Sequence, residues 1–273
     1  MAPLQEARAA GVTAPRTILM PLPSYGFDPT ESSIPWKKLV TAGHRVVFAT
    51  PAGAPAEADR RMLTGEGLPA LFRRSLMATP EAAALYGEMS ASEGFSRPVS
   101  YEQIRSGEHD ALVLPGGHDK GMRVYLESPV LRGKVAWFFD HDRPVGAICH
   151  GTLLAGRARS GEVSRAGKSV LWGRRTTGLT RRQEMIAYYI TRSRLGDYYR
   201  TYPVPMADEL ISFLRDPGDY SPGPGYPIPL RRDSDRNLAP GFTVRDGLYL
   251  SARWPGDAHR FAADFLGILA EAP

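Results

Sequence analysis

Cys149, the one cysteine of the 273-residue chain, is the residue best placed to do chemistry. It stands between an apolar run, residues 144–148, and a stretch of small residues that begins at His150. A buried strand followed by a helix would place the thiol at a helix N-terminus, where unpaired N–H groups and the helix dipole lower a thiol pKa. Gly146 and Gly151 leave room for the tight turn of a nucleophile elbow.

The residues alone leave two interpretations of Cys149 open. A lone cysteine is commonly a small buried hydrophobe. A thiolate at an elbow is instead a nucleophile, with the next backbone N–H available to an oxyanion. The pair Gly116-Gly117 favours the nucleophile because it follows a second apolar run, residues 110–115. In a parallel sheet both turns would lie at the carboxyl ends of the strands, where ligand sites are found.

The elements that must position these turns alternate between apolar strands and helices. We expect strands over 17–20, 44–50, 110–115 and 144–149, and helices capped by Ser32 and Ser33, over 128–140 and from His150. Continuous apolar strands that alternate with helices predict an α/β fold with a mainly parallel sheet covered on both faces. We also expect a hairpin that turns at Asp246-Gly247, and a last helix that begins at Asp257, whose side chain is expected to cap it.

The pattern predicts a single α/β domain over residues 17–273, preceded by a flexible tail over 1–16. Residues 52–107 have helical spacing without clear strands, which indicates a helical insertion beside the sheet. Residues 216–229 hold five prolines and three glycines and predict an extended loop.

Composition excludes several classes of protein. A single cysteine rules out an intramolecular disulfide and a cysteine-based zinc site, and it suits a reducing compartment. No apolar run approaches the length of a membrane span, and the first 16 residues lack the apolar core of a secretory signal. We therefore expect a cytoplasmic protein without membrane contact.

The net charge of +5 conceals an arginine-rich stretch. Eleven basic residues face three acids between Arg157 and Arg200. Such a stretch is compatible with binding an anionic partner, but it is more typical of a solvated surface. No zinc finger, helix-turn-helix or basic pattern interleaved with aromatic residues supports nucleic acid, so we expect no nucleic-acid partner.

Four motifs together resemble the ThiJ/PfpI superfamily. They are LPGGH (114–118), AICHG (147–151), Glu31 after the first strand, and DGLYLSARWPGDA (246–258). The resemblance runs from about Thr17 to Leu269 and is strongest to the branch that holds the heat-shock glyoxalase III proteins and the parkinsonism-associated protein. It implies the class I glutamine amidotransferase-like fold, a flavodoxin-like three-layer sandwich with a nucleophilic cysteine at the elbow.

The resemblance also implies acidic partners for Cys149. In this family a glutamate after the first strand contacts the thiol and tunes its ionisation, which here would be Glu31. The alternative for Glu31 is an acid that a helix N-terminus favours. In the glyoxalase-type branch an acid about 35 residues further on orients the histidine that follows the cysteine, here His150. Glu184 occupies that place, in the first turn of a helix that a capping box at Thr180 predicts.

Glu184 has an alternative interpretation, as an exposed partner of Arg181 or Arg182. Further site residues are implied beside the glycine turn. Gly116 and Gly117 would serve the oxyanion, and His118 could contact substrate. Asp119 departs from the glycine usual in the glyoxalase-type branch, and it is expected to narrow the pocket or add a charge. The aromatic stretch Tyr198-Tyr199-Arg-Thr-Tyr202 could line a pocket, although packing is the commoner use.

The resemblance implies an enzyme without cofactor or metal that acts on a small electrophilic carbonyl. The first candidate reaction is a glyoxalase III-like conversion of a 2-oxoaldehyde to a 2-hydroxy acid. The second is that of a hydratase or hydrolase of the same fold in specialised metabolism. A redox-sensing stress protein or chaperone that uses the same cysteine is the alternative from another class. Glutaminase activity is disfavoured, because Arg260 and Phe261 follow His259 where amidotransferases have His-x-Glu. A homodimer is expected from the family.

Overall fold

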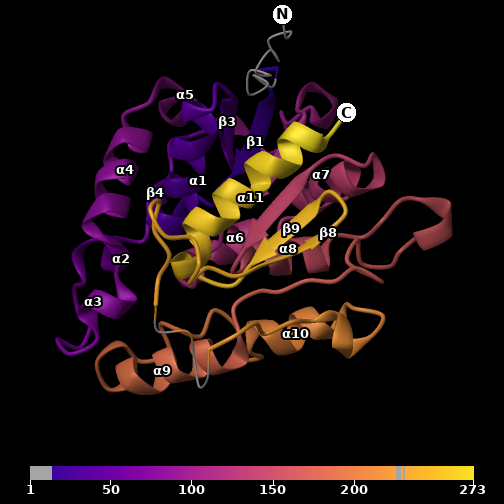
Figure 1. The fold of residues 1–273 in the computed structure, drawn as a ribbon. Coiled ribbons are helices and arrows are strands. Elements are labelled where there is room, and N and C mark those ends of the chain that lie inside the picture. The colour runs from indigo at the N-terminus through magenta and orange to yellow at the C-terminus, as the bar shows by residue number, and fades with distance from the viewer. Residues whose placement is uncertain (1–13, 226–228, 230) are drawn as a thin grey trace, which may run out of the picture.

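Short apolar runs form the central strands, and helices bury them from both sides (Figure 1). The computed structural model describes residues 14–225, 229 and 231–273. Its seven-stranded sheet has the order β5, β3, β1, β6, β7, β9, β8. The bounds of these strands are Val99–Ser100, Arg45–Thr50, Thr17–Pro21, Ala111–Leu114, Val145–Ile148, Tyr249–Ala252 and Thr243–Asp246. The pairs are parallel except β8 with β9, which confirms the mainly parallel sheet.

The helices form the two outer layers of a flavodoxin-like sandwich. One face of the sheet carries α1 and α11, with α4 outside α1, and the other face carries α7 and α8. The helices are α1 (Pro29–Thr41), α2 (Arg60–Thr64), α3 (Arg73–Leu76), α4 (Pro80–Ser90), α5 (Glu93–Ser96), α6 (Arg123–Leu126), α7 (Pro129–Asp140), α8 (Gly151–Arg157), α9 (Arg181–Leu195), α10 (Met206–Ser212) and α11 (Ala258–Glu271). In Figure 1, α9 and α10 run along the end of the molecule opposite the labelled C-terminus.

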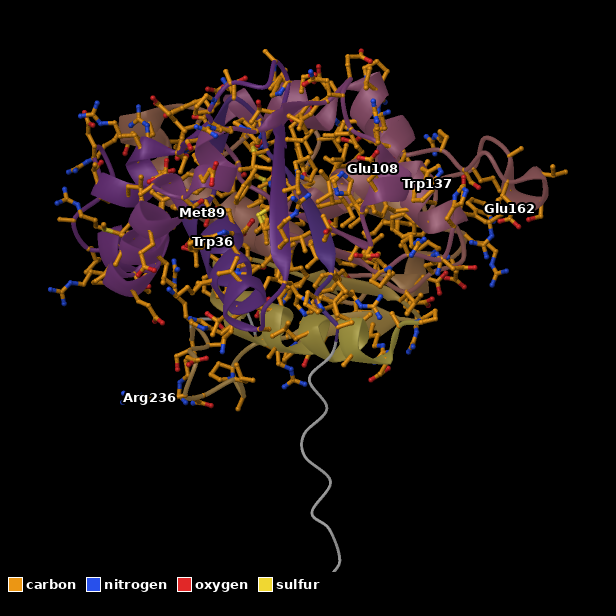
Figure 2. The ribbon with its side chains drawn as sticks, turned by 90° about the horizontal axis from the view of Figure 1, so that it is seen from above. Trp36, Met89, Glu108, Trp137, Glu162 and Arg236 are labelled. Carbon is orange, nitrogen blue, oxygen red and sulfur yellow. The ribbon has the colours of Figure 1, made fainter. Side chains whose placement is uncertain are left out.

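The hydrophobic core extends from the sheet into both helical layers. Viewed from above, Trp36 of α1 and Met89 of α4 lie close together, whereas Glu162 and Arg236 stand at the periphery (Figure 2). Trp36 and Met89 are both buried. Among the described residues, no helix is both long enough and apolar enough to cross a membrane.

The first helix begins earlier than its serines predict. Its cap is Asp28, whose Oδ1 accepts hydrogen bonds from the backbone N–H groups of Thr30 and Glu31 at 2.8 and 3.1 Å. Ser32 and Ser33 are buried inside the helix, so the prediction that they cap it was wrong. Pro29 explains the earlier start, because proline suits the first turn, where no N–H is needed.

The insertion predicted over 52–107 is mainly helical, and it also contains two strands. It holds α2 to α5 together with β4 (Glu57–Ala58) and β5. β4 pairs with β2 (Tyr25–Phe27) in a separate two-stranded sheet, and β5 forms the edge of the main sheet. The expectation of no strands was wrong because two-residue strands are too short to show alternation.

The closing hairpin is present as predicted, but its turn lies one residue later, at Gly247-Leu248, because Asp246 pairs with Tyr249. Asp257 stands just before α11, but its side chain makes no cap bond to that helix. Its carboxylate instead accepts hydrogen bonds from Arg253 Nε and Nη2, both at 2.9 Å, in a fully buried ion pair. The prediction of a capping role for this side chain was therefore wrong. Of the predicted tail and loop, residues 1–13 and 226–228 lie outside the described residues.

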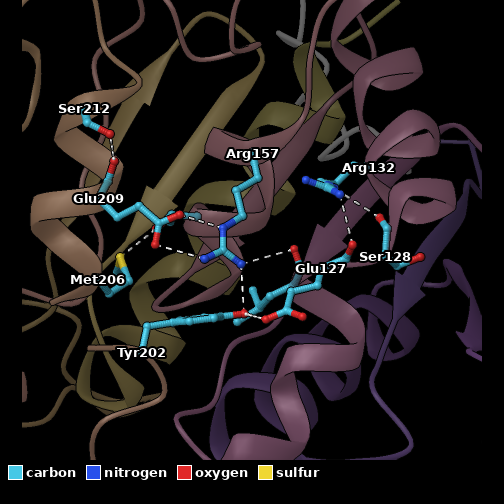
Figure 3. Close-up of polar contacts among 10 residues, drawn as sticks. Glu127, Ser128, Arg132, Arg157, Tyr202, Met206, Glu209 and Ser212 are labelled. Atoms are coloured by element: carbon cyan, nitrogen blue, oxygen red, sulfur yellow. Dashed lines mark hydrogen bonds and ion pairs between the residues drawn. The ribbon is translucent and has the colours of Figure 1, made fainter. Parts of the chain in front are cut away.

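α8, the helix that follows Cys149, is bound to α10 at its C-terminal end. Arg157, the last residue of α8, pairs with Glu209 of α10 through Nε–Oε1 and Nη2–Oε2 contacts of 2.7 and 2.9 Å. Its Nη1 donates to the Tyr202 hydroxyl at 2.9 Å, and Figure 3 shows this guanidinium between the two side chains. A bidentate, partly buried pair of this kind fixes orientation as well as distance, so it holds α10 against the C-terminal end of α8.

Candidate functional site

Cys149 occupies a strained turn between β7 and α8. Its φ is 55°, a left-handed conformation that non-glycine residues rarely adopt. Its N–H donates to the carbonyl of Ala252 at 3.0 Å, which holds the turn to β9. A Cβ on the residue after next, Gly151, would lie 2.0 Å from the carbonyl oxygen of Leu114. The turn therefore has the geometry of a nucleophile elbow, and glycine at 151 is required for it.

Glu31 points from the first turn of α1 to the elbow. The side chain is fully buried, and its Oε2 accepts a hydrogen bond from the N–H of Gly116 at 3.0 Å. Gly116 is wedged between the two groups, because a Cβ there would lie 2.7 Å from Glu31 Oε2 and 2.8 Å from Cys149 Cβ. Burial, and then the charge of Asp28, raise the pKa of Glu31 well above its usual value.

The thiol of Cys149 has a raised pKa, contrary to the prediction from its helix end. Burial is the main cause, and the nearby carboxylates of Glu31 and Asp28 add to it. The His150 N–H acts in the opposite direction, as a helix terminus should, but it does not outweigh burial. Thiol and carboxyl therefore form a coupled pair in which burial and mutual repulsion of the charged forms favour the protonated state of each group.

His150 places an imidazole beside the sulfur. Its Nδ1 lies 3.5 Å from Cys149 Sγ, and the side chain is buried. Burial, and then the charges of His118 and Arg157, lower its pKa to about 3. The ring is therefore neutral at physiological pH, and its Nδ1 is placed to relay a proton from the thiol and not to hold it.

Glu184 reaches the same site but has other partners than predicted. The capping box of Thr180 is present, so Glu184 lies in the first turn of α9, where it is buried rather than exposed. Its Oε2 accepts a hydrogen bond from the Met206 N–H at 2.8 Å, and its Oε1 lies 3.7 Å from Arg200 Nε. Burial raises its pKa to about 7. No hydrogen bond joins it to His150 in the part of the chain that the structure describes.

The glycine turn after β6 supports the site from the opposite side. The N–H of Gly116 is taken by Glu31, and Gly117 has a φ of 151° that brings it against the backbone of Gly26. His118 stacks on Tyr199 with ring centroids 4.2 Å apart, and burial lowers its pKa to about 4.

Asp119 was expected to narrow the pocket or to add a charge to it, but its side chain does not line the pocket. Its carboxylate accepts a hydrogen bond from the Gly121 N–H at 2.7 Å and caps a short turn, Lys120–Met122. It therefore takes part in the local fold, and the residues that line the pocket do not include it. Of the aromatic stretch, Tyr199 lines the pocket, while Tyr198 packs with Met62 and Leu68.

The elbow opens into a cavity of about 620 Å³. Its polar base contains Asp28, Glu31, Gly117, His118, Cys149 and Glu184. Its apolar wall comes mainly from α9 and from the α3 region, by which we mean residues 71–76. The apolar residues that line it include Met62, Phe72, Leu76, Leu179, Ile186 and Ile190. An apolar cavity with a few convergent polar groups and shifted pKa values is the usual form of a small-molecule site.

Two further residues of this cavity were not predicted to line it from the sequence: Arg232 and Trp254. Arg232 follows the proline-rich loop, and its guanidinium lies 5.4 Å from the centre of the Trp254 ring. Trp254 belongs to the motif at residues 246–258, and the family resemblance of that motif was the one signal for it in the sequence. Arg232 has no such signal because it is one of many arginines.

Comparisons with known proteins agree with this architecture. A family model described as ThiJ/PfpI family-like matches residues 22–213. An uncharacterized protein of Schizosaccharomyces pombe is 30% identical over 145 residues, which cover 52% of this chain and 51% of that protein. The chain thus matches about half the length of this curated relative.

Solved structures share the fold over nearly the whole chain. Glyoxalase III from Candida albicans has a TM-score of 0.66 at 17% identity, covering 93% of this chain and 97% of that one. The Rapid Encystment Protein of Francisella tularensis has a TM-score of 0.64 at 16% identity, covering 93% and 99%. Drosophila melanogaster DJ-1beta has a TM-score of 0.52 at 18% identity, covering 94% and 91%. At such identities the likeness shows the fold alone.

Proposed function

The chain belongs to the ThiJ/PfpI family, and from that premise we propose that it converts a 2-oxoaldehyde to a 2-hydroxy acid through Cys149, without a cofactor. One observation carries the proposal. A strained elbow with φ of 55° presents a thiol to a cavity, with the Glu31 carboxyl and the His150 imidazole beside the sulfur. This arrangement suits a nucleophile whose proton must be moved during attack.

The first step is addition of the thiol to the aldehyde carbon. A bond forms between Sγ and that carbon, the carbonyl π bond breaks, and its electron pair goes to oxygen. The thiol proton passes by way of Nδ1 of His150, 3.5 Å from Sγ, to the oxygen as its negative charge develops, which gives a hemithioacetal. Because the pKa of His150 is lowered to about 3, the ring relays this proton and returns to its neutral form.

The second step moves hydrogen between the two carbons of the substrate. A base removes the proton from the former aldehyde carbon, and the neighbouring ketone carbon receives one. The first carbon is thereby oxidised to a thioester while the second is reduced to an alcohol, so no external oxidant or reductant is needed. His150 and Glu31, both at the sulfur, are the groups we assign to these proton transfers.

The last step is hydrolysis. Water adds to the thioester carbon, the carbon–sulfur bond breaks, and the thiol recovers its proton. The overall change adds one water to the 2-oxoaldehyde and releases a 2-hydroxy acid. The N–H of His150, which favours negative charge on Cys149, is the donor we assign to the oxyanion.

Glu184 has a positioning role in this proposal. Its carboxylate joins α9 to the N–H of Met206 at the start of α10. α9 lines the cavity, so loss of this contact would change the cavity wall rather than the proton transfers. We therefore do not include it in a triad with His150.

A hydratase or hydrolase that uses the same thiol is the second candidate. The observation that favours it is that Glu184 binds the Met206 N–H instead of His150, so the acid–histidine pair implied by the glyoxalase-type branch is not formed by this residue. Fold and elbow alone do not select the reaction.

The experiment is a cofactor-free assay of methylglyoxal and phenylglyoxal consumption, with the 2-hydroxy acid quantified. Wild type and Glu102→Gln, an exposed acid outside the cavity, should form product at equal rates, while Cys149→Ala should fall to background. Equal rates in wild type and Cys149→Ala would refute the proposal. Substrate loss without 2-hydroxy acid would favour the second candidate.

A further inference from the structure

One part of the cavity collects polar atoms that lack partners. Five residues that line it have a buried side-chain nitrogen or oxygen without a hydrogen-bond partner among the described residues. One is Glu31 Oε1, on the carboxyl that is coupled to the Cys149 thiol. The other four are His118 Nε2, Tyr199 Oη, Arg232 Nη1 and Trp254 Nε1. Buried polar groups are nearly always paired in folded proteins, so these four atoms around one cavity indicate that a ligand completes them.

The four side chains are held in place by other contacts. Nη2 of Arg232 donates to the carbonyls of Ser75 and Met77 at 2.9 and 3.0 Å, which leaves Nη1 available. The same guanidinium lies over the Trp254 ring, with 5.4 Å from Cζ to the ring centre. Tyr199 is stacked on His118 at an interplanar angle of 12°. The donors therefore form two stacked pairs that need little reorganisation to bind.

The chemistry of these atoms defines the ligand. Arginine and tryptophan side chains donate hydrogen bonds and accept none, so the missing group must be an acceptor. Arg232 also forms no ion pair with any described residue, although Asp28 lies near enough to affect its pKa. Asp28 Oδ1 is already occupied as the cap of α1. A carboxylate supplied by the ligand would satisfy both the charge and the donors.

The remaining wall is apolar and leaves considerable space. Leu76, Ile186 and Ile190 face the cavity, and Leu71, which also lines it, is 84% exposed. A water molecule occupies about 30 Å³, so a cavity of about 620 Å³ holds on the order of twenty groups of that size. A ligand that fills this volume needs a hydrocarbon portion as well as its polar ends.

We propose that the cavity binds a carbonyl compound that also carries a carboxylate and a hydrocarbon chain, with the carboxylate on Arg232 and Trp254. The carbonyl carbon then lies at Cys149, and the chain lies along the wall formed by α9 and the α3 region. The identity of this compound as a substrate rests on the proposed function. The binding of the carboxylate does not, so it can be tested without turnover.

The test compares octanoate with octan-1-ol, which has the same chain and no charge, by calorimetric titration of the full-length protein. Wild type should bind octanoate about tenfold or more tightly than octan-1-ol, the effect expected of charge-assisted hydrogen bonds. Arg232→Gln should abolish this preference. Arg231→Ala, which removes the exposed neighbouring arginine outside the cavity, should retain it.

Two further variants keep the test valid if Arg232→Gln folds poorly. Trp254→Phe and Tyr199→Phe each delete one donor that has no partner among the described residues, so folding should be unaffected while octanoate binding weakens several-fold. Equal affinity for octanoate and octan-1-ol in wild type, or an unchanged preference in all three variants, would overturn the inference. Octanoate binding by a protein that consumes no 2-oxoaldehyde would refute the proposed function and leave the carboxylate site supported.

Discussion

The Glu31 carboxyl raises the pKa of the Cys149 thiol, and the thiol in turn partly offsets the rise that burial causes in the pKa of Glu31. Both groups are buried, and the N–H of Gly116 binds the carboxyl at 3.0 Å. This coupling makes the sulfur and the carboxyl one proton-holding unit. The proposed chemistry depends on that unit.

Glu31→Gln should keep the fold and lose most of the activity. Glutamine has nearly the same shape and can still accept the Gly116 N–H, but it cannot exchange a proton with the substrate. We expect kcat/KM for the 2-oxoaldehyde to fall about 100-fold or more. Glu102→Gln is the matched control at an exposed site. Wild-type kinetics in Glu31→Gln would exclude Glu31 from the reaction.

The raised thiol pKa predicts slow alkylation of the resting enzyme. At pH 7.5 Cys149 should react with iodoacetamide more slowly than glutathione, and its rate should keep rising beyond pH 9 without a plateau. The urea-unfolded protein is the control, because its thiol should titrate near the ordinary value of about 8.5. A plateau below pH 7 would show a stable thiolate instead. Slow alkylation would also argue against rapid oxidation by peroxide, and so against a redox sensor.

Gly116→Ala should damage the site more than the fold. The added Cβ would lie 2.7 Å from Glu31 Oε2 and from the His150 nitrogen, so one of them must move. We expect activity to fall about 100-fold or more and the free energy of unfolding to fall by about 1–3 kcal/mol. Gly133→Ala in α7 is the control: nothing lies within 4 Å of its Cβ, so it should stabilise the fold by roughly 0.5–1 kcal/mol with unchanged kinetics. Full activity in Gly116→Ala would contradict the close packing.

The free energy of unfolding should decrease as pH rises from about 6.5 to 8. Burial raises the pKa values of Glu184 and Asp233 to about 7. A carboxyl with a raised pKa binds its proton more tightly in the folded state, so its stabilising contribution is complete below the unfolded pKa and is lost as pH passes the folded pKa. Two such groups predict a decrease of about 1–2 kcal/mol over this interval.

Urea titrations at several pH values measure this decrease. Glu184→Gln should remove about half of it, and Glu102→Gln should leave it unchanged. Below about pH 6.5 the slope should flatten, because His118 and His150 have lowered pKa values of about 4 and 3, and the unfolded chain binds those protons more readily, which offsets the two carboxyls. Stability that increases steadily from pH 6.5 to 8 would contradict the assignments.

The turns that build the site were largely predictable from sequence. Apolar runs before Gly116 and Cys149 predicted parallel strands whose carboxyl ends meet, and β6 pairs with β7 in that way. The capping box at Thr180 and the closing hairpin are local patterns with known backbone geometry, and both were confirmed, although the hairpin turns one residue later than predicted.

The sequence did not predict how deeply a side chain is buried, or which residues far apart in the chain meet. The helix end at Cys149 suggested a lowered thiol pKa, but the opposite effect of burial depends on everything packed around the sulfur. Glu184 was expected to orient His150, yet the carboxylate is bound by Met206, 22 residues away in sequence. Arg232 and Trp254 meet in the cavity from separate loops, and no periodic pattern connects loop residues.

Covalent catalysis by Cys149 is tested most directly by rapid-quench mass spectrometry of the enzyme during turnover of phenylglyoxal. The proposed mechanism requires a transient adduct on Cys149 with the mass of one whole substrate molecule, because both the hemithioacetal and the thioester retain all its atoms. The adduct should disappear as 2-hydroxy acid accumulates, and Cys149→Ala should show neither. Turnover with an unmodified Cys149, or product formed by Cys149→Ala, would rule out covalent catalysis by this residue.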